Sequence, residues 1–318
     1  MNEIKFGVFL PFYAFLDNYY ECSSVFGCVR RVILECERLG YHSVWLDDHM
    51  MFEQASILES WTSLSALAAC TSRIRLGTMV LCNSFRHPAV LAKMATTLDN
   101  ISGGRLELGI GAGSQKEEHD AFGFGFPRSA VRIERLKEAA EIIEKMWTEE
   151  KVEFAGKHYK ISQAVCEPKP VQKPHPPIVI GGSGEKLTMK VAARFADRFD
   201  WGYIPTLELY EHKLKILESY CEKIGRDFQK IEKSCWPWGQ IFIESNPQNV
   251  EKTVQRAKPK GVPLEDFKKN NFVGSAEACQ EKIQKYKNIG VTHFMLFFGD
   301  LPNLNGLRLF AKRTMKKE

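Results

Sequence analysis

The chain has 318 residues, of which 44% are hydrophobic and 26% are charged, and its formal net charge is +5. This length and hydrophobicity allow a large buried core, either as two ordinary domains or as one large α/β barrel. The positive charge is spread along the sequence and is dense only at residues 312–317, where cations suit a helix end. Composition therefore gives no sign of a nucleic-acid partner, and no apolar run reaches the roughly 20 residues that cross a membrane.

Nine cysteines are scattered along the chain, and none of them forms a Cys-x-x-Cys pair. Their odd number and irregular spacing are typical of reduced thiols, not of a disulfide framework or a zinc site. The first residues lead directly into an apolar run, without a basic segment and an apolar leader. We therefore expect a cytoplasmic protein without a bound metal.

Apolar segments alternate between two patterns along the whole chain. Short continuous runs, many with β-branched residues, predict eight strands at residues 4–10, 43–46, 73–81, 105–110, 178–180, 198–203, 231–244 and 291–298. Apolar residues at helical spacing predict at least one helix after each strand, at residues 23–39, 61–70, 89–98, 131–147, 186–196, 207–224, 247–258, 275–289 and 305–316.

No linker divides this alternation, so we predict that residues 1–318 form a single domain, a closed (β/α)8 TIM barrel. A doubly wound open sheet is the alternative, but it usually has fewer strands and a Gly-x-Gly-x-x-Gly loop after the first one. Between strands four and five, residues 152–161 predict a hairpin, and the five prolines of residues 168–177 predict an extended linker. We interpret about residues 150–176 as an insertion into the barrel.

The carboxyl ends of all strands meet on one face of such a barrel, where ligands bind. Strand two is followed by Asp48 and His49, strand three by residues 79–83, and strand four by Gly111-Ala112-Gly113-Ser114. Strand five ends in Gly181-Gly182-Ser183-Gly184, just before a predicted helix. Backbone amides in such a loop can bind a phosphate, although glycines at a strand–helix junction often make only a tight turn.

Several polar side chains near these strand ends have two interpretations. His49 could donate or accept a proton, and Asp48 could orient His49 or bind a ligand. Both residues could instead have only a capping or packing role. Residues 115–129 predict a long loop, and its cluster at 117–120 (Glu-Glu-His-Asp) matches no zinc template, which favours a solvated loop or helix start. Cys82 is a possible nucleophile, but no base is identifiable, so a buried neutral thiol is the preferred interpretation.

Four segments, in this order, resemble the luciferase-like flavin and deazaflavin oxidoreductases. They are residues 39–45 with Asp48-His49, residues 75–80 with 86–89, residues 103–113, and residues 176–185. The resemblance implies a TIM barrel with an insertion, a homodimer, and either coenzyme F420 or FMN in the barrel mouth. It also implies a non-prolyl cis peptide bond between Met79 and Val80, against the face of the cofactor ring.

The resemblance also assigns the site residues by position. It places Asp48 and His49 beside the reactive ring, and the Gly181–Gly184 loop on the cofactor phosphate. The remaining expected cofactor contacts are Met79, Val80, Asn83, Gly111, Ala112, Gly113 and Ser114.

Two positions depart from the family pattern. Ser114 replaces a glutamate of the sugar-phosphate dehydrogenases, which puts that substrate in doubt. Ala112 replaces an arginine that binds the FMN phosphate in the luciferase. The loss of a cation mildly favours F420, whose phosphodiester carries one charge, over FMN, whose monoester carries nearly two.

We therefore predict an F420-dependent oxidoreductase that moves a hydride between C5 of the deazaflavin and a small organic substrate, with His49 handling one proton. The alternatives are an FMN-dependent monooxygenase supplied with reduced flavin by a separate reductase, and a barrel that binds a cofactor without catalysis. The aromatic residues of loops 12–20, 50–57 and 122–126 suggest an apolar or ring-bearing substrate, unless these residues only pack the loops.

Overall fold

The computed structural model describes residues 3–15, 24–52, 56–204, 206–244, 251–255, 258–259 and 261–315. Eight parallel strands form a closed ring. The sheet starts at β3 and runs round to β5, and the ring closes because β5 also pairs with β3. In sequence order they are β1 (Lys5–Phe9), β2 (Ser43–Leu46), β3 (Arg75–Thr78), β5 (Leu106–Gly111), β8 (Ile178–Gly181), β9 (Arg198–Asp200), β10 (Glu232–Cys235) and β13 (His293–Leu296). The predicted (β/α)8 barrel is confirmed.

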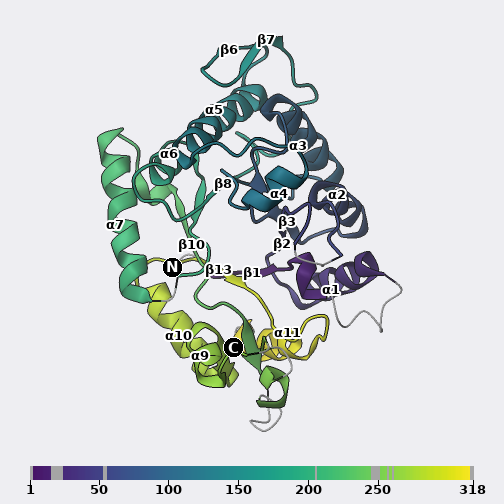
Figure 1. The fold of residues 1–318 in the computed structure, drawn as a ribbon. Helices are drawn as coiled ribbons and strands as arrows, with labels where there is room; N and C mark the ends of the chain where they lie inside the picture. Colours follow the sequence, from purple (N-terminus) through teal and green to yellow (C-terminus); the bar gives the residue numbers. More distant parts are fainter. Residues whose placement is uncertain are drawn as a thin grey trace.

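Helices surround this ring of strands (Figure 1). They are α1 (Val25–Leu39), α2 (Ser60–Cys70), α3 (Pro88–Ser102), α4 (Lys116–Ala121), α5 (Ser129–Thr148), α6 (Thr188–Phe195), α7 (Leu207–Lys223), α9 (Leu264–Asn270), α10 (Ala276–Asn288) and α11 (Asn305–Phe310). The first helix has the expected ends: the Ser24 side chain accepts the N–H of Gly27, and Gly40 ends the helix with φ 85°. None of the helices in the described ranges is both long and apolar enough to span a lipid bilayer.

The inside of the barrel is filled in layers, because alternate residues of each strand face the axis. Trp45 occupies the middle layer and leaves no room for a side chain at Gly77, where a Cβ atom would lie 2.3 Å from its ring. Below it, at the amino ends of the strands, the buried Arg198 bonds Glu107 and Glu232. Polar groups therefore close the bottom of the barrel.

The structure corrects several predicted boundaries. The strand predicted at residues 231–244 is two strands, because the chain leaves the barrel after β10 and β11 (Ile241–Ile243) pairs with β12 (Phe272–Gly274), which we did not predict. Helix α9 was also missed, and of the helix predicted at 247–258 the structure describes residues 251–255 as helical. The loop predicted at 115–129 contains α4, whose first turn carries two glutamates that suit a helix N-terminus.

A two-stranded hairpin, β6 (Val152–Ala155) with β7 (Lys160–Ala164), follows α5 and extends beyond it in Figure 1. Residues 165–177 then lead to β8, with cis peptide bonds before Pro168 and Pro174. The hairpin was predicted, whereas its interpretation as an insertion stays a prediction.

The expectation of reduced thiols is wrong at one position. Seven cysteines of the described residues are free, but Cys28 is disulfide-bonded. The spacing of cysteines along a sequence cannot show which of them the fold brings together.

Candidate active site

A cavity of about 420 Å³ lies at the carboxyl ends of the barrel strands. Every predicted site residue except Asn83 and Gly184 lines this cavity. The lining residues among those predicted are Asp48, His49, Met79, Val80, Gly111, Ala112, Gly113, Ser114, Gly181, Gly182 and Ser183. Asn83 lies just outside, where its side chain donates to Tyr159 and its backbone N–H donates to Gly111. The Gly184 carbonyl accepts the N–H of Met189 at the start of α6. Four strand ends thus meet around one space, as the sequence predicted.

Val80 forms one wall of this cavity, and glycines surround it. The peptide bond between Met79 and Val80 is cis, as the resemblance implied. A Cβ atom at Gly111 or at Gly181 would lie 2.7 Å from a methyl carbon of Val80. These two positions therefore need glycine for a steric reason, and their backbones and Val80 together make a smooth surface.

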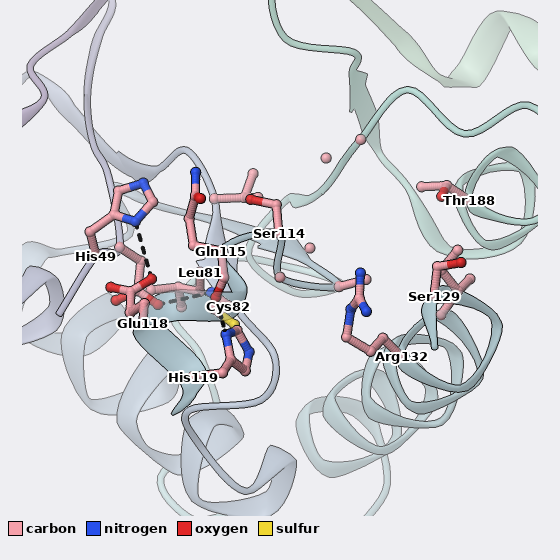
Figure 2. A pocket seen from close by; sticks show the side chains of 18 of the residues that line it. His49, Leu81, Cys82, Ser114, Gln115, Glu118, His119, Ser129, Arg132 and Thr188 are labelled. Carbon is pink, nitrogen blue, oxygen red and sulfur yellow. Dashed lines mark hydrogen bonds and ion pairs between the residues drawn. The ribbon is translucent and has the colours of Figure 1, made fainter. Parts of the chain in front are cut away.

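His49 is held by Glu118, a residue of α4. The Glu118 Oε2 atom lies 3.3 Å from Nδ1 of His49, as Figure 2 shows. The other carboxylate oxygen accepts the backbone N–H groups of Met50 and Met51. Of the two expectations for the cluster at 117–120, the helix start is confirmed, because the cluster lies in α4. The solvated loop is wrong for Glu118, which is almost fully buried and lines the cavity.

Asp48 does not bond to His49. Its two oxygens accept a bidentate pair from Arg86, at 2.7 and 2.9 Å, and Oδ2 also accepts the N–H of Cys82 at 2.8 Å. Such a pair is strong and geometrically specific. This arrangement anchors the loop after β3 to the end of β2 and supports a positioning role for Asp48.

Cys82 and His119 form a second polar contact at the cavity wall. The thiol sulfur lies 3.6 Å from Nε2 of His119, and the ring's Nδ1 lies 2.6 Å from the carbonyl of Gln115. Since Nδ1 must donate to that carbonyl, Nε2 is left to accept the thiol proton. Burial raises the pKa of Cys82 to about 11, so the thiol stays neutral, which agrees with the preferred interpretation.

The opposite side of the cavity from His49 carries Ser129, Arg132 and Thr188, in addition to the Gly181–Gly184 loop (Figure 2). The Arg132 guanidinium lies 3.8 Å from the centre of the Phe126 ring and donates to the Pro127 carbonyl at 2.6 Å. Its Nε is buried with no hydrogen-bond partner in the described part of the chain. Hydroxyl groups, backbone amides and one cation thus converge on a place that suits a phosphate group.

A parallel eight-stranded barrel with a polar cavity at the carboxyl ends of its strands defines the class of TIM-barrel enzymes. The sequence model of the luciferase-like monooxygenase family matches residues 4–258, and the chain belongs to this family.

Individual relatives carry more specific names. The chain is 30% identical over 305 residues to the F420-dependent glucose-6-phosphate dehydrogenase of Segniliparus rotundus. This alignment covers 87% of this chain and 89% of that protein. It is 38% identical over 205 residues to the enzyme of that name from Microbacterium testaceum. That alignment covers 62% of this chain and only 59% of the relative. An F420-dependent secondary alcohol dehydrogenase, solved with an F420–acetone adduct, superposes with a TM-score of 0.80 at 22% identity over 98% of both chains. At that identity the superposition shows the shared fold alone.

Proposed function

We propose that this protein is an F420-dependent oxidoreductase that transfers a hydride between C5 of the deazaflavin and a small organic substrate. The observation that carries the proposal is one cavity lined by His49, Val80 and residues Gly181, Gly182 and Ser183. The relative from Segniliparus rotundus, which aligns over most of both chains, is named for its use of F420. When bound, the deazaflavin supplies the site that accepts or donates the hydride.

The cavity fits such a cofactor at both ends. The surface made by Val80, Gly111 and Gly181 suits the face of a flat ring system, because no side chain projects from the two glycines. The Gly181–Gly184 loop, Ser129 and Thr188 would bind the phosphate. Among the described residues that line the cavity, Arg132 supplies the one lysine or arginine side chain. A single cation suits the singly charged phosphodiester of F420 better than the nearly doubly charged monoester of FMN.

His49 would hold or release one proton beside the ring. Glu118 fixes the Nδ1 side of the imidazole, so the Nε2 side is available to the cavity. Asp48 would support the site through Arg86 and Cys82, without handling a proton itself. Asn83 and Gly184 would contribute through the backbone that they position at its edge.

The main alternative is an FMN-dependent monooxygenase supplied by a separate reductase, which the name of the family supports. Equilibrium binding of F420 and of FMN to the purified protein separates the two functions. We expect tight binding of F420 and weaker binding of FMN; tight binding of FMN with none of F420 would reject the proposal.

A barrel that binds the cofactor without catalysis is tested by turnover. His49→Ala should lower F420 turnover about 100-fold or more while the protein still binds F420, since positioned acid–base groups contribute factors of this size. The single-domain organisation of residues 1–318, the cytoplasmic location and the homodimer rest on the expectations from the sequence and stay predictions.

A further inference from the structure

The carboxylate of Asp47 is buried at the mouth of the barrel, and one of its oxygens has no hydrogen-bond partner among the described residues. Asp47 is 2% exposed. Its Oδ1 accepts the N–H of Phe12 at 3.0 Å, whereas Oδ2 has no hydrogen-bond partner among the residues that the structure describes. A buried carboxylate oxygen without a donor is costly, so a bound molecule that supplies the missing hydrogen bond would explain its presence.

The strand register places Asp47 beside the cavity. Trp45 faces the barrel axis, and alternation places Asp47, two residues further on, on the same side and one layer nearer the mouth. The N–H of Met79 donates to the carbonyl of Leu46 at 2.8 Å, so Met79 lies next to Asp47 on the neighbouring strand. Met79 lines the cavity and also packs against the axial cluster that contains Trp45. Asp47 is not one of the residues that line the cavity, and it adjoins the space in front of the proposed ring site through Met79.

Aromatic side chains form the rest of this mouth, and we call Phe9, Tyr13, Trp236 and Phe297 the aromatic layer. The ring centres of Phe9 and Trp236 are 4.8 Å apart, and those of Phe9 and Phe297 are 5.8 Å apart. Tyr13 lies edge-on to Phe297 at 6.4 Å. None of these four side chains can pair with a phosphate, and a phosphorylated substrate would face the Asp47 carboxylate.

The groups that face Asp47 favour a role in proton transfer. Burial raises the pKa of Asp47 to about 6, although the Phe12 N–H and His49 lower it and Asp48 raises it slightly. Near neutral pH both forms of the carboxyl group are therefore populated. Burial and the nearby Asp47 raise the pKa of Tyr13, so its hydroxyl stays neutral.

We propose that Asp47 and the aromatic layer form the substrate subsite, for an uncharged molecule that carries a hydroxyl or carbonyl group on an apolar body. This inference rests on the proposed function. In oxidation, the carbinol C–H bond breaks and its hydrogen leaves with the electron pair as hydride to the cofactor. The O–H bond breaks as the C=O bond forms, and Oδ2 of Asp47 takes the proton. In reduction the same carboxyl group returns the proton to the substrate oxygen.

The test compares Asp47→Asn with Asp300→Asn. In Asp47→Asn, the amide oxygen still accepts the Phe12 N–H, while the oxygen that can hold a proton is lost. Asp300 is a matched control, because burial also raises its pKa to about 6 and one of its oxygens accepts a backbone N–H. Its other oxygen has no hydrogen-bond partner in the part of the chain that the structure describes. Asp300 does not line the cavity, and its Oδ2 accepts the N–H of Gly306 in the outer helix α11.

With F420-loaded protein and cyclohexanol as the probe, we expect Asp47→Asn to lower kcat about 100-fold and to remove the pH dependence near pH 6. The dissociation constant for F420 should change less than about twofold, and Asp300→Asn should match the wild type. Adding cyclohexanone should perturb the infrared carboxyl band of the wild type and of Asp300→Asn, but not that of Asp47→Asn.

Three results would overturn the inference and leave the proposed function intact, provided that F420 binds. The first is an unchanged kcat in Asp47→Asn. The second is turnover of glucose 6-phosphate but not of cyclohexanol. The third is a wild type that neither turns over cyclohexanol nor changes its infrared carboxyl band with cyclohexanone. Failure of the wild type to bind F420 would instead remove the proposed function and this inference with it.

Discussion

Glu118 links the loop after β2 to the helix after β5, because its carboxylate lies 3.3 Å from Nδ1 of His49 and accepts the N–H groups of Met50 and Met51. The imidazole is therefore positioned by a residue far away in the sequence. The contact is partly buried, and a hydrogen bond to a charged group in such a place is stronger than one at the surface. Glu118 therefore helps to position His49, whose ring also lies 5.6 Å from the Phe52 ring.

Replacing Glu118 by Gln should lower kcat about tenfold or more and leave F420 affinity nearly unchanged, because an amide cannot stabilise a protonated imidazole as a carboxylate does. Steady-state kinetics and F420 fluorescence titration measure the two quantities. Glu117→Gln is the control, since Glu117 is the exposed neighbour on the same helix. A Glu118→Gln protein with normal kcat would show that the contact with His49 has no role in turnover.

Arg132 should determine how strongly the cofactor phosphate is held. Arg132→Ala should weaken F420 binding about 10- to 100-fold, which corresponds to the loss of one hydrogen-bonded charged pair. Isothermal titration at low and high salt checks this, and the salt dependence should decrease in the variant. Lys137→Ala removes the same charge from the exposed face of α5 and should leave affinity unchanged. Equal losses in both variants would indicate a general charge effect and not a phosphate contact.

The glycines around Val80 make a steric prediction. In Gly181→Ala the new methyl group would lie 2.7 Å from a Val80 methyl carbon, so Val80 must shift in the wall of the cofactor site. We expect at least tenfold weaker F420 binding and a loss of about 1–3 kcal/mol in unfolding free energy, as for other overpacked positions. Gly125→Ala is the control, because nothing lies within 4 Å of the added Cβ atom. Normal F420 affinity in Gly181→Ala would exclude this wall from the site.

The sequence predicted those parts of the site that follow directly from strand ends. His49 and the Gly181–Gly184 loop were found because each comes immediately after an apolar run, and the barrel brings such ends together. Glu118 was missed, since a run of four polar residues looks solvated until α4 packs over the loop after β2. Arg132 was missed as well, because its position at the start of an amphipathic helix does not show that it faces a cavity.

The sequence pattern also failed to predict the shortest strands. Strands β11 and β12 have three residues each, which is too few to show a period, and they pair with each other outside the barrel. Tertiary contacts determine such elements, and local pattern does not contain that information.

His293 should make stability depend on pH. Its side chain is fully buried at the bottom of the barrel, with Nδ1 2.7 Å from Arg198 and Nε2 3.2 Å from the Ser43 hydroxyl. Burial and, secondly, Arg198 lower the pKa of His293 from 6.5 to about 4. Between these two values the unfolded chain binds a proton that the folded protein excludes. The free energy of unfolding should therefore fall as pH falls from 6.5 towards 4, by at most about 3 kcal/mol from this group.

Urea unfolding of the wild type and of His293→Gln over this pH range measures the effect. Gln can accept from Arg198 and donate to Ser43, so the variant keeps both contacts without a titrating ring. Asp47 and Asp300 have raised pKa values and oppose the trend, because each binds its proton more readily in the folded state. Both remain in each protein, so the difference between the two curves isolates His293. That difference should shrink as pH falls from 6.5 to 4, and parallel curves would mean that His293 binds its proton equally well in the folded and the unfolded chain.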